Sequence, residues 1–179
     1  FIDENLILHP DYKIFNLDLA YLKKDYYTKL RNTLLEFKKK YKTNIIICSH
    51  PSSDKKNFKQ YFPNFKIVSG KTLETVRKSK LVIIHQSTAI SFPVILNKPI
   101  VFLNYKEISK SFLYENIANF SKLFKKKYYL IDKKIENFNH EDFKIDKKMY
   151  KKYLNNYIVH PKAKKKSMWL ELIKELKKK

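Results

Sequence analysis

Histidine and hydroxyl side chains follow short apolar runs in this chain, and they could bind a phosphate group. His50 and His85 each end such a run. An imidazole can donate a hydrogen bond to a phosphate oxygen, or protonate that oxygen as it leaves. Ser87 and Thr88 come soon after His85 and would open a helix, whose unpaired N–H groups can receive an anion. These residue types favour a phosphate site.

Two further polar clusters extend this hypothesis. Asp3 and Glu4 follow an apolar pair at the start of the chain. A carboxylate there could act as a general base that takes a proton from an attacking hydroxyl. Lys71 follows another apolar run and could neutralise a phosphate. The candidate phosphate contacts are His50, Pro51, Ser52, Gly70, Lys71, Thr72, His85, Gln86, Ser87 and Thr88.

Each of these residues also has a structural interpretation. Ser87 or Thr88 could be an ordinary N-cap, since most helices begin on such a residue. His50 could be a turn histidine at a strand end. His85 could be a buried hydrogen-bonding residue, and Lys71 is one of 37 lysines. The nucleotide-phosphate interpretation depends on the grouping of these residues and not on any one of them.

The composition excludes several familiar sites. Gly70 is the only glycine, so neither a G-x-G-x-x-G turn nor a Walker A loop can form. Cys48 is the only cysteine, which leaves no disulfide framework and no cysteine-rich metal site. His9, His140 and His160 are scattered without ligand spacing. No Gly-x-Ser-x-Gly elbow is present, and we expect neither a metal nor a cofactor.

The elements that must position these residues alternate along the chain. Continuously apolar strands between helices are typical of a parallel sheet covered on both faces. We therefore expect an α/β, Rossmann-like fold, in which ligands bind outside the carboxyl ends of the strands. Strands are predicted at 1–2, 45–48, 65–69, 81–84, 100–103 and 128–131. Helices are predicted at 19–41, at 73–79 after a Thr72 cap, and at 88–97 with a kink at Pro93.

Two parts of the chain are expected from this pattern. Residues 1–140 would form the nucleotide-sugar-binding domain. Residues 141–179 would form a basic C-terminal segment of two helices broken at His160-Pro161, the second with Met168, Trp169 and Leu172 on one face. Because the chain opens inside a predicted strand, we expect it to be part of a longer protein.

The net charge of +22 comes from 39 basic and 17 acidic residues. A nucleic-acid surface would favour arginine for bidentate contacts, yet Arg31 and Arg77 are the only arginines. Abundant Lys, Ile, Asn, Tyr and Phe instead indicate an A/T-rich coding sequence. We expect no specific nucleic-acid partner.

Lysine is densest toward the C-terminus, where residues 122–179 hold 19 lysines and 7 acidic residues. Such a surface would attract anionic lipid. No apolar stretch reaches about 18 residues, the length that a membrane-spanning helix needs. We expect a cytoplasmic protein with a possible peripheral contact on the inner face of the cell membrane.

The region 45–103, which contains ICSHPSSD and SGKTLETVRKSKLVIIHQSTAISFPVILNKPIVFL, resembles the donor-binding half of bacterial GT-B glycosyltransferases. The most similar members act in surface polysaccharide and lipo-oligosaccharide synthesis and include bacterial sialyltransferases. The shared motifs are an acidic pair before glycine, a His-Pro pair and a Ser/Thr pair. Here they match Asp3-Glu4, His50-Pro51 and Ser87-Thr88 in the same order, with Asn5 in place of the glycine.

This resemblance implies roles for the matching residues. Asp3 would be the base that deprotonates the acceptor hydroxyl. His50 would bind the donor phosphate or assist its departure, and Ser87 and Thr88 would hold that phosphate. The implied activity is an inverting, metal-independent transfer from a CMP-activated sugar, sialic-acid-like or Kdo-like, to a surface glycan or glycolipid. Only one of the two GT-B halves fits in this chain, so the acceptor-binding half would lie outside it.

Two alternatives stay open. The same scaffold could transfer glycerol phosphate from CDP-glycerol, or a sugar from a UDP donor. The absence of an Asp-x-Asp sequence favours the CMP donor, because metal-dependent enzymes for nucleoside diphosphate donors usually carry one. A non-catalytic basic module that binds nucleic acid or membrane is the other alternative, and it predicts a steep salt dependence.

Overall fold

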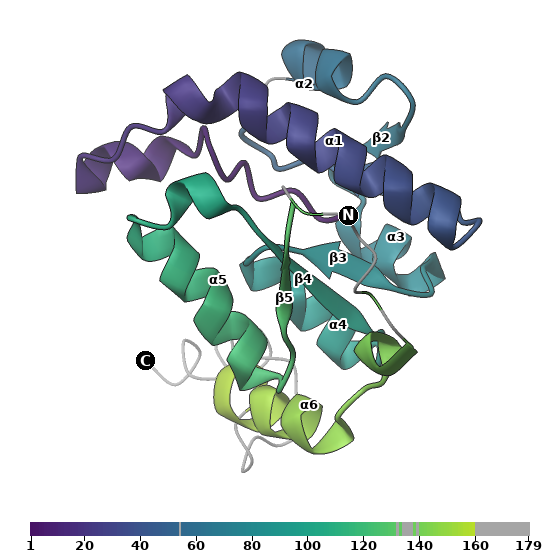
Figure 1. Ribbon diagram of the computed structural model, residues 1–179. Helices are drawn as coiled ribbons and strands as arrows, with labels where there is room; N and C mark the ends of the chain where they lie inside the picture. The colour runs from purple at the N-terminus through teal and green to yellow at the C-terminus, as the bar shows by residue number, and fades with distance from the viewer. Residues whose placement is uncertain (54, 132, 134–137, 139, 160–179) are drawn as a thin grey trace, which may run out of the picture.

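The computed structural model describes the chain except residues 54, 132, 134–137, 139 and 160–179 (Figure 1). Its strands are short and all pair in parallel. They form a two-stranded sheet, β1–β2, and a three-stranded sheet, β3–β4–β5. The predicted strands from position 45 onward are therefore confirmed. Their bounds are β1 Ile46–Cys48, β2 Lys66–Val68, β3 Val82–Ile84, β4 Ile100–Asn104 and β5 Tyr128–Leu130.

Ile2 joins the two sheets. It forms a parallel bridge to Cys48 of β1 on one side and to Ile84 of β3 on the other. Its N–H donates to the carbonyl of Ile83 at 2.9 Å, and the N–H of Asp3 donates to the carbonyl of Cys48 at 2.9 Å. The order across the sheets is β2, β1, Ile2, β3, β4, β5. This order is consistent with the Rossmann-like, doubly wound α/β class, which places its ligand crevice where the strand order reverses.

Helices cover both faces, as the alternation predicted (Figure 1). One apolar cluster joins Ile47, Ile83 and Val101 of the strands to Leu30 and Leu34 of helix α1. Neighbouring strand residues point the opposite way, because side chains alternate along a strand. Val82, Ile84 and Phe102 pack with Val76 of α3 and Val94 of α4. The helices are α1 Lys23–Lys40, α2 Lys55–Tyr61, α3 Thr72–Lys78, α4 Ser91–Ile95, α5 Phe112–Leu123 and α6 Lys147–Tyr153.

The helix predicted at 19–41 is confirmed as α1, and Tyr26, Leu30, Leu34 and Phe37 on one of its sides are buried. The helix begins at Lys23 and not at position 19, because a 3-10 turn at Ala20–Leu22 precedes it. This apolar side is what fixes α1 against the sheet.

The predicted Thr72 cap was wrong, and the predicted helix at 88–97 is shorter and of a different type. Thr72 is the first residue of α3, and Lys71 holds the cap position without a side-chain hydrogen bond. The predicted helix at 88–97 is a 3-10 turn at Thr88–Ile90 followed by the short α4. Pro93 lies in the first turn of α4, where its missing N–H is not needed, so it does not kink the helix.

The described part of the C-terminal segment packs onto the α/β core. Asp146 caps α6 by accepting hydrogen bonds from the N–H groups of Lys148 and Met149, both at 3.0 Å. Tyr150 and Tyr153 of α6 are buried in the cluster on the α4 side of the sheet. The second helix predicted there, around Met168 and Trp169, lies outside the described residues.

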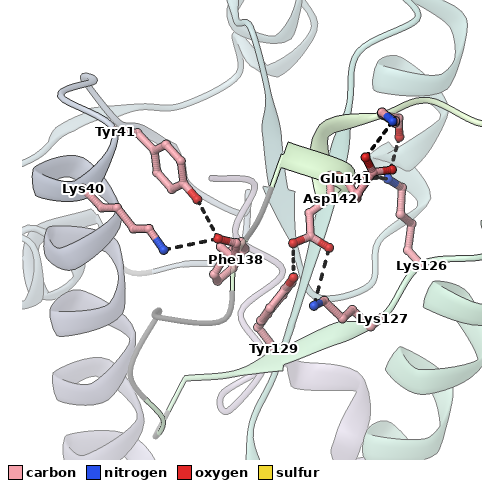
Figure 2. Close-up of polar contacts among 9 residues, drawn as sticks. Lys40, Tyr41, Lys126, Lys127, Tyr129, Phe138, Glu141 and Asp142 are labelled. Atoms are coloured by element: carbon pink, nitrogen blue, oxygen red, sulfur yellow. Dashed lines mark hydrogen bonds and ion pairs between the residues drawn. The ribbon is translucent and has the colours of Figure 1, made fainter.

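Polar contacts fix the chain between β5 and α6 (Figure 2). The ammonium of Lys126 donates to the carbonyl of Asp142 at 2.9 Å. The hydroxyl of Tyr129 donates to the carboxylate of Asp142, and the rings of Tyr129 and Phe138 stack with centroids 3.6 Å apart. Lys40 of α1 donates to the carbonyl of Phe138 at 3.2 Å. This segment is thereby tied to α1 as well as to β5.

Candidate functional site

The acidic pair and the His-Pro pair meet at the carboxyl ends of the strands. Asp3 follows Ile2 directly, and one of its oxygens, Oδ2, accepts the backbone N–H of His50 at 3.1 Å and the hydroxyl of Ser53 at 3.0 Å. Its other oxygen accepts the N–H of Asn5 at 3.1 Å. The side chain lies almost wholly inside, with Asp3 3% exposed. Asp3 therefore holds the loop that carries His50 against the centre of the sheet.

Ser52 determines which nitrogen of His50 carries the proton. The N–H of Ser52 donates to His50 Nδ1 at 3.2 Å, and its hydroxyl lies 2.7 Å from the same nitrogen. Because the N–H of Ser52 already donates to Nδ1, this nitrogen also accepts the hydroxyl hydrogen of Ser52. Asn5 donates to the hydroxyl oxygen at 3.1 Å. A ring nitrogen that accepts these bonds is unprotonated, which leaves the hydrogen of the neutral ring on Nε2. His50 is thus a donor through Nε2.

Burial also keeps His50 neutral. Desolvation lowers its pKa below the ordinary imidazole range, and the neighbouring His9 lowers it further. Asp3 and Asp11 act in the opposite direction and do not outweigh this effect. A neutral ring with its hydrogen on Nε2 can donate a hydrogen bond to a phosphate oxygen.

Asn5 has a backbone conformation that explains a departure from the expected motif. Its φ is +57°, in the left-handed region. Glycine adopts this conformation without strain, and asparagine tolerates it better than most residues. Asn5 can therefore stand where the resemblance expects glycine, and its amide also holds Ser52.

Glu4 links the acidic pair to the end of β3. Its Oε2 accepts the backbone N–H of Gln86 at 3.0 Å. Its Oε1 is enclosed and has no hydrogen-bond donor among the residues that the structure describes. Burial raises the pKa of Glu4 well above its ordinary value, and the charge of Asp3 raises it further. Glu4 is therefore a buried carboxyl group with one oxygen able to accept or hold a proton.

His85 has the structural role and is not available to a ligand. It is 0% exposed, its Nδ1 donates to the carbonyl of Leu103 at 2.8 Å, and its Nε2 accepts the hydroxyl of Tyr26 at 2.9 Å. Burial lowers its pKa to about 4, so the ring is neutral at pH 7. This placement corrects the expectation that His85 contacts a phosphate.

Gln86, Ser87 and Thr88 lie at the edge of the cluster. The Oγ of Ser87 accepts the N–H of Ala89 at 3.2 Å, which is the ordinary N-cap interpretation. Gln86 and Ser87 are partly exposed and Thr88 is exposed. Because Glu4 holds Gln86, these residues are joined through the acidic pair to the loop of His50.

Gly70, Lys71 and Thr72 lie apart from this cluster. They follow β2, the outer strand of its sheet, and no described contact joins them to Asp3 or His50. Lys71 instead lines a cavity of about 960 Å³ that extends along α3 to the starts of β1 and β3. The lining of this cavity includes none of Asp3, Glu4 and His50, so Lys71 does not belong to their cluster.

The structure also brings in a residue that sequence reasoning set aside as scattered. The ring of His9 lies beside that of His50, with centroids 5.0 Å apart. His9-Pro10 repeats the His50-Pro51 pair, and this repetition was the signal that could have identified it.

Comparison with protein-family models, with curated proteins and with solved structures finds no match to this chain. Within the residues that the structure describes, no group of three or more His, Cys, Asp and Glu side chains is placed to hold a metal ion. In that same part of the chain, no helix combines the length and apolar character needed to cross a bilayer. The fold and the cluster together define an α/β domain with a polar site at the carboxyl ends of its parallel strands.

Proposed function

We propose that this domain binds a nucleotide-activated sugar, favoured as a CMP-sugar, and forms the donor side of a glycosyltransferase. The observation that carries the proposal is a pair of hydrogen bonds, donated by the backbone N–H of His50 to Asp3 and by the backbone N–H of Gln86 to Glu4. They assemble the acidic pair, the His-Pro pair and the residues before Ser87 at the reversal of strand order, where doubly wound sheets bind nucleotides. The resemblance to GT-B enzymes supports the same assignment.

In the proposed reaction, the acceptor hydroxyl oxygen forms a bond to the anomeric carbon of the sugar. The bond from that carbon to the donor phosphate oxygen breaks, and its electron pair stays on the phosphate. His50 donates a hydrogen bond from Nε2 to this phosphate and stabilises the developing charge. The hydroxyl proton passes to a carboxylate of the acidic pair. Atoms and charge balance without a further reactant.

Asp3 is the base that the resemblance implies, and Glu4 is the alternative within the same pair. Both Asp3 oxygens already accept hydrogen bonds, whereas Oε1 of Glu4 accepts none from the described residues. Both side chains are buried, so the acceptor reaches either one only when the segment after Ile2 opens locally. The geometry supports Asp3 as a positioning residue for His50 and Glu4 as the proton acceptor.

The test is calorimetric titration of the folded chain with CMP, CDP, UDP and GDP at about 150 mM salt, where weak attraction to a surface of this charge is reduced. We expect CMP to bind and His50→Ala to weaken that binding by at least about tenfold, the effect of one lost hydrogen bond to a charged group. Lys71→Ala is the matched control, because it removes a candidate that lies outside the cluster, and it should retain binding.

Three other results are informative. Binding of none of the four nucleotides by folded protein would overturn the proposal. Preference for CDP or UDP over CMP would select CDP-glycerol or a UDP-sugar as donor. If CMP bound wild type and His50→Ala equally, and the affinity fell steeply with salt, a non-specific basic surface would be identified.

A further inference from the structure

His9 and His50 share one local geometry. In each case a proline follows the histidine, and the N–H two residues after the histidine donates to its Nδ1. The distances are 3.3 Å from Asp11 to His9 and 3.2 Å from Ser52 to His50. Because Nδ1 accepts in both rings, the hydrogen of each neutral imidazole is on Nε2.

The two rings are neighbours although the histidines lie in different segments. His9 precedes the 3-10 helix at Pro10–Phe15, and His50 follows β1. Their ring centroids are 5.0 Å apart with a 60° tilt, and both side chains are partly exposed. Neither Nε2 has a hydrogen-bond partner in the part of the chain that the structure describes. Two adjacent N–H donors without an acceptor favour an anion with several oxygens.

We infer that His9 and His50 together bind one phosphate group, each donating a hydrogen bond from Nε2. The identity of that phosphate as the one in a nucleotide donor rests on the proposed function. The pair itself does not, since any phosphate monoester or inorganic phosphate offers the same oxygens. His9 is therefore a second phosphate ligand, beyond the motifs that the resemblance supplies.

The charged groups around the pair make binding depend on pH. Asp3 accepts the backbone N–H of His50, and Asp11 Oδ2 lies 3.7 Å from His9 Nδ1. The rings of Tyr12 and His9 have centroids 5.5 Å apart, and burial next to Glu4, Asp11 and Asp3 keeps the pKa of Tyr12 above its ordinary value, so Tyr12 stays neutral. The imidazole of His9 opposes protonation of His50 and so lowers the pKa of His50.

The negative charge of a bound phosphate favours a protonated ring and so counteracts the effect of the second imidazole. Phosphate binding should therefore strengthen as the pH falls through the ordinary imidazole range, about 6.5. A phosphate monoester itself takes up a proton at a pH of about 6, so the increase in affinity is expected above that pH.

The first measurement is NMR titration of the histidine rings in the folded chain without ligand. We expect His9→Gln to raise the pKa of His50, since the second imidazole is removed. Addition of inorganic phosphate to wild-type protein should raise the pKa of His50 and shift the ring signals of both His9 and His50. If neither inorganic phosphate nor CMP shifts the ring signals of His9 or His50, the inference is overturned.

The second measurement is calorimetry with CMP as the probe. His9→Gln and His50→Gln should each weaken binding about tenfold, the effect of one hydrogen bond to a charged group. Lys13→Gln is the control, since Lys13 is exposed in the same 3-10 helix and the change removes a positive charge without an imidazole. Its affinity should stay within about twofold of wild type, as a screened surface charge allows.

The results separate this inference from the proposed function. If CMP binds and only His50→Gln weakens it, the role of His9 is wrong and the donor site stands. If no nucleotide binds but inorganic phosphate shifts the ring signals of both histidines, the histidine pair stands and the donor proposal fails.

Discussion

The carboxylate of Asp3 accepts the backbone N–H of His50 at 3.1 Å, although the two residues are 47 positions apart in the sequence. The same carboxylate also accepts the hydroxyl of Ser53 and the N–H of Asn5. One side chain thus fixes the turn after Ile2 and the turn after β1. The position of the His50 ring depends on Asp3 even though their side chains share no hydrogen bond.

Asp3→Asn should loosen this arrangement. The NH₂ group of asparagine cannot accept a hydrogen bond, so it would leave at least one of the donors that Asp3 binds without an acceptor. A buried unsatisfied group costs about 1–3 kcal/mol. Urea unfolding measures this loss, and the affinity for CMP should fall with it. Ser53→Ala is the control because it removes a single donor and should cost about 1 kcal/mol. Equal stability of Asp3→Asn and wild type would contradict the positioning role.

Glu4→Gln should raise stability increasingly with pH. The folded-state pKa of Glu4 lies well above the unfolded value, so the wild-type protein loses stability as the pH rises above the unfolded pKa, about 4.3, and through the folded pKa. Glutamine does not ionise and lacks this loss. Urea midpoints from pH 5 to pH 8 should separate progressively, and a constant difference would argue against a buried ionisable Glu4.

The same variant tests the proton transfer. If Glu4 accepts the hydroxyl proton, the transfer rate measured with the complete enzyme should fall by at least about 100-fold, the usual contribution of a general base. A variant that is more stable and less active would point to a functional carboxyl group and not to a structural one. Full activity of Glu4→Gln would indicate that Asp3, and not Glu4, accepts the hydroxyl proton.

His85 should make the protein less stable in weak acid. Its folded pKa is about 4, below the unfolded value of about 6.5. Between these values the unfolded chain binds more protons, so the free energy of unfolding falls as the pH drops from about 6.5 to about 4, by on the order of 3 kcal/mol. Comparing His85→Gln with its parent in the Glu4→Gln background isolates this slope, because Glu4 acts with the opposite sign. Parallel pH profiles of the two proteins would contradict the burial of a neutral His85.

Lys126→Met should destabilise the segment between β5 and α6. The ammonium of Lys126 donates to the carbonyls of Glu141 at 3.4 Å, Asp142 at 2.9 Å and Lys144 at 2.5 Å. We expect a loss of about 1–3 kcal/mol from carbonyls left without a donor, and faster exchange of the Lys144 N–H, which donates to Glu141. Lys125→Met is the control, since Lys125 is 66% exposed and its removal should cost no more than about 1 kcal/mol. Similar losses for both variants would show that the contacts of Figure 2 do not fix this segment.

The strands and α1 could be predicted because their signals are local. Apolar runs such as the one before Cys48 predict a buried strand, and the spacing of Tyr26, Leu30 and Leu34 predicts one helix face. The predicted helix through Pro93 failed because the choice between a 3-10 turn and an α-helix depends on packing that the sequence does not display.

The site was predictable only in part, for a different reason. Which residues end strands can be derived from the sequence, but which strand ends adjoin depends on the order of strands. That order is what brings Asp3 to His50 and leaves Lys71 outside the cluster. The hydrogen bonds that join His85 to Tyr26 and Leu103 could not be predicted without knowing the order of the strands. The same is true of the contact between His9 and His50.

Ile2 lies between the two sheets, with a backbone bridge on each side. The side chains that follow it, Asp3 and Glu4, extend this connection, one toward the β1 side and one toward the β3 side. A ligand that contacts His50 and Ser87 together would therefore connect the two sheets a second time, across Ile2. The backbone amides of Ile2, Asp3 and Cys48, whose hydrogen bonds join the two sheets at this line, would then become protected from hydrogen exchange together when the ligand binds.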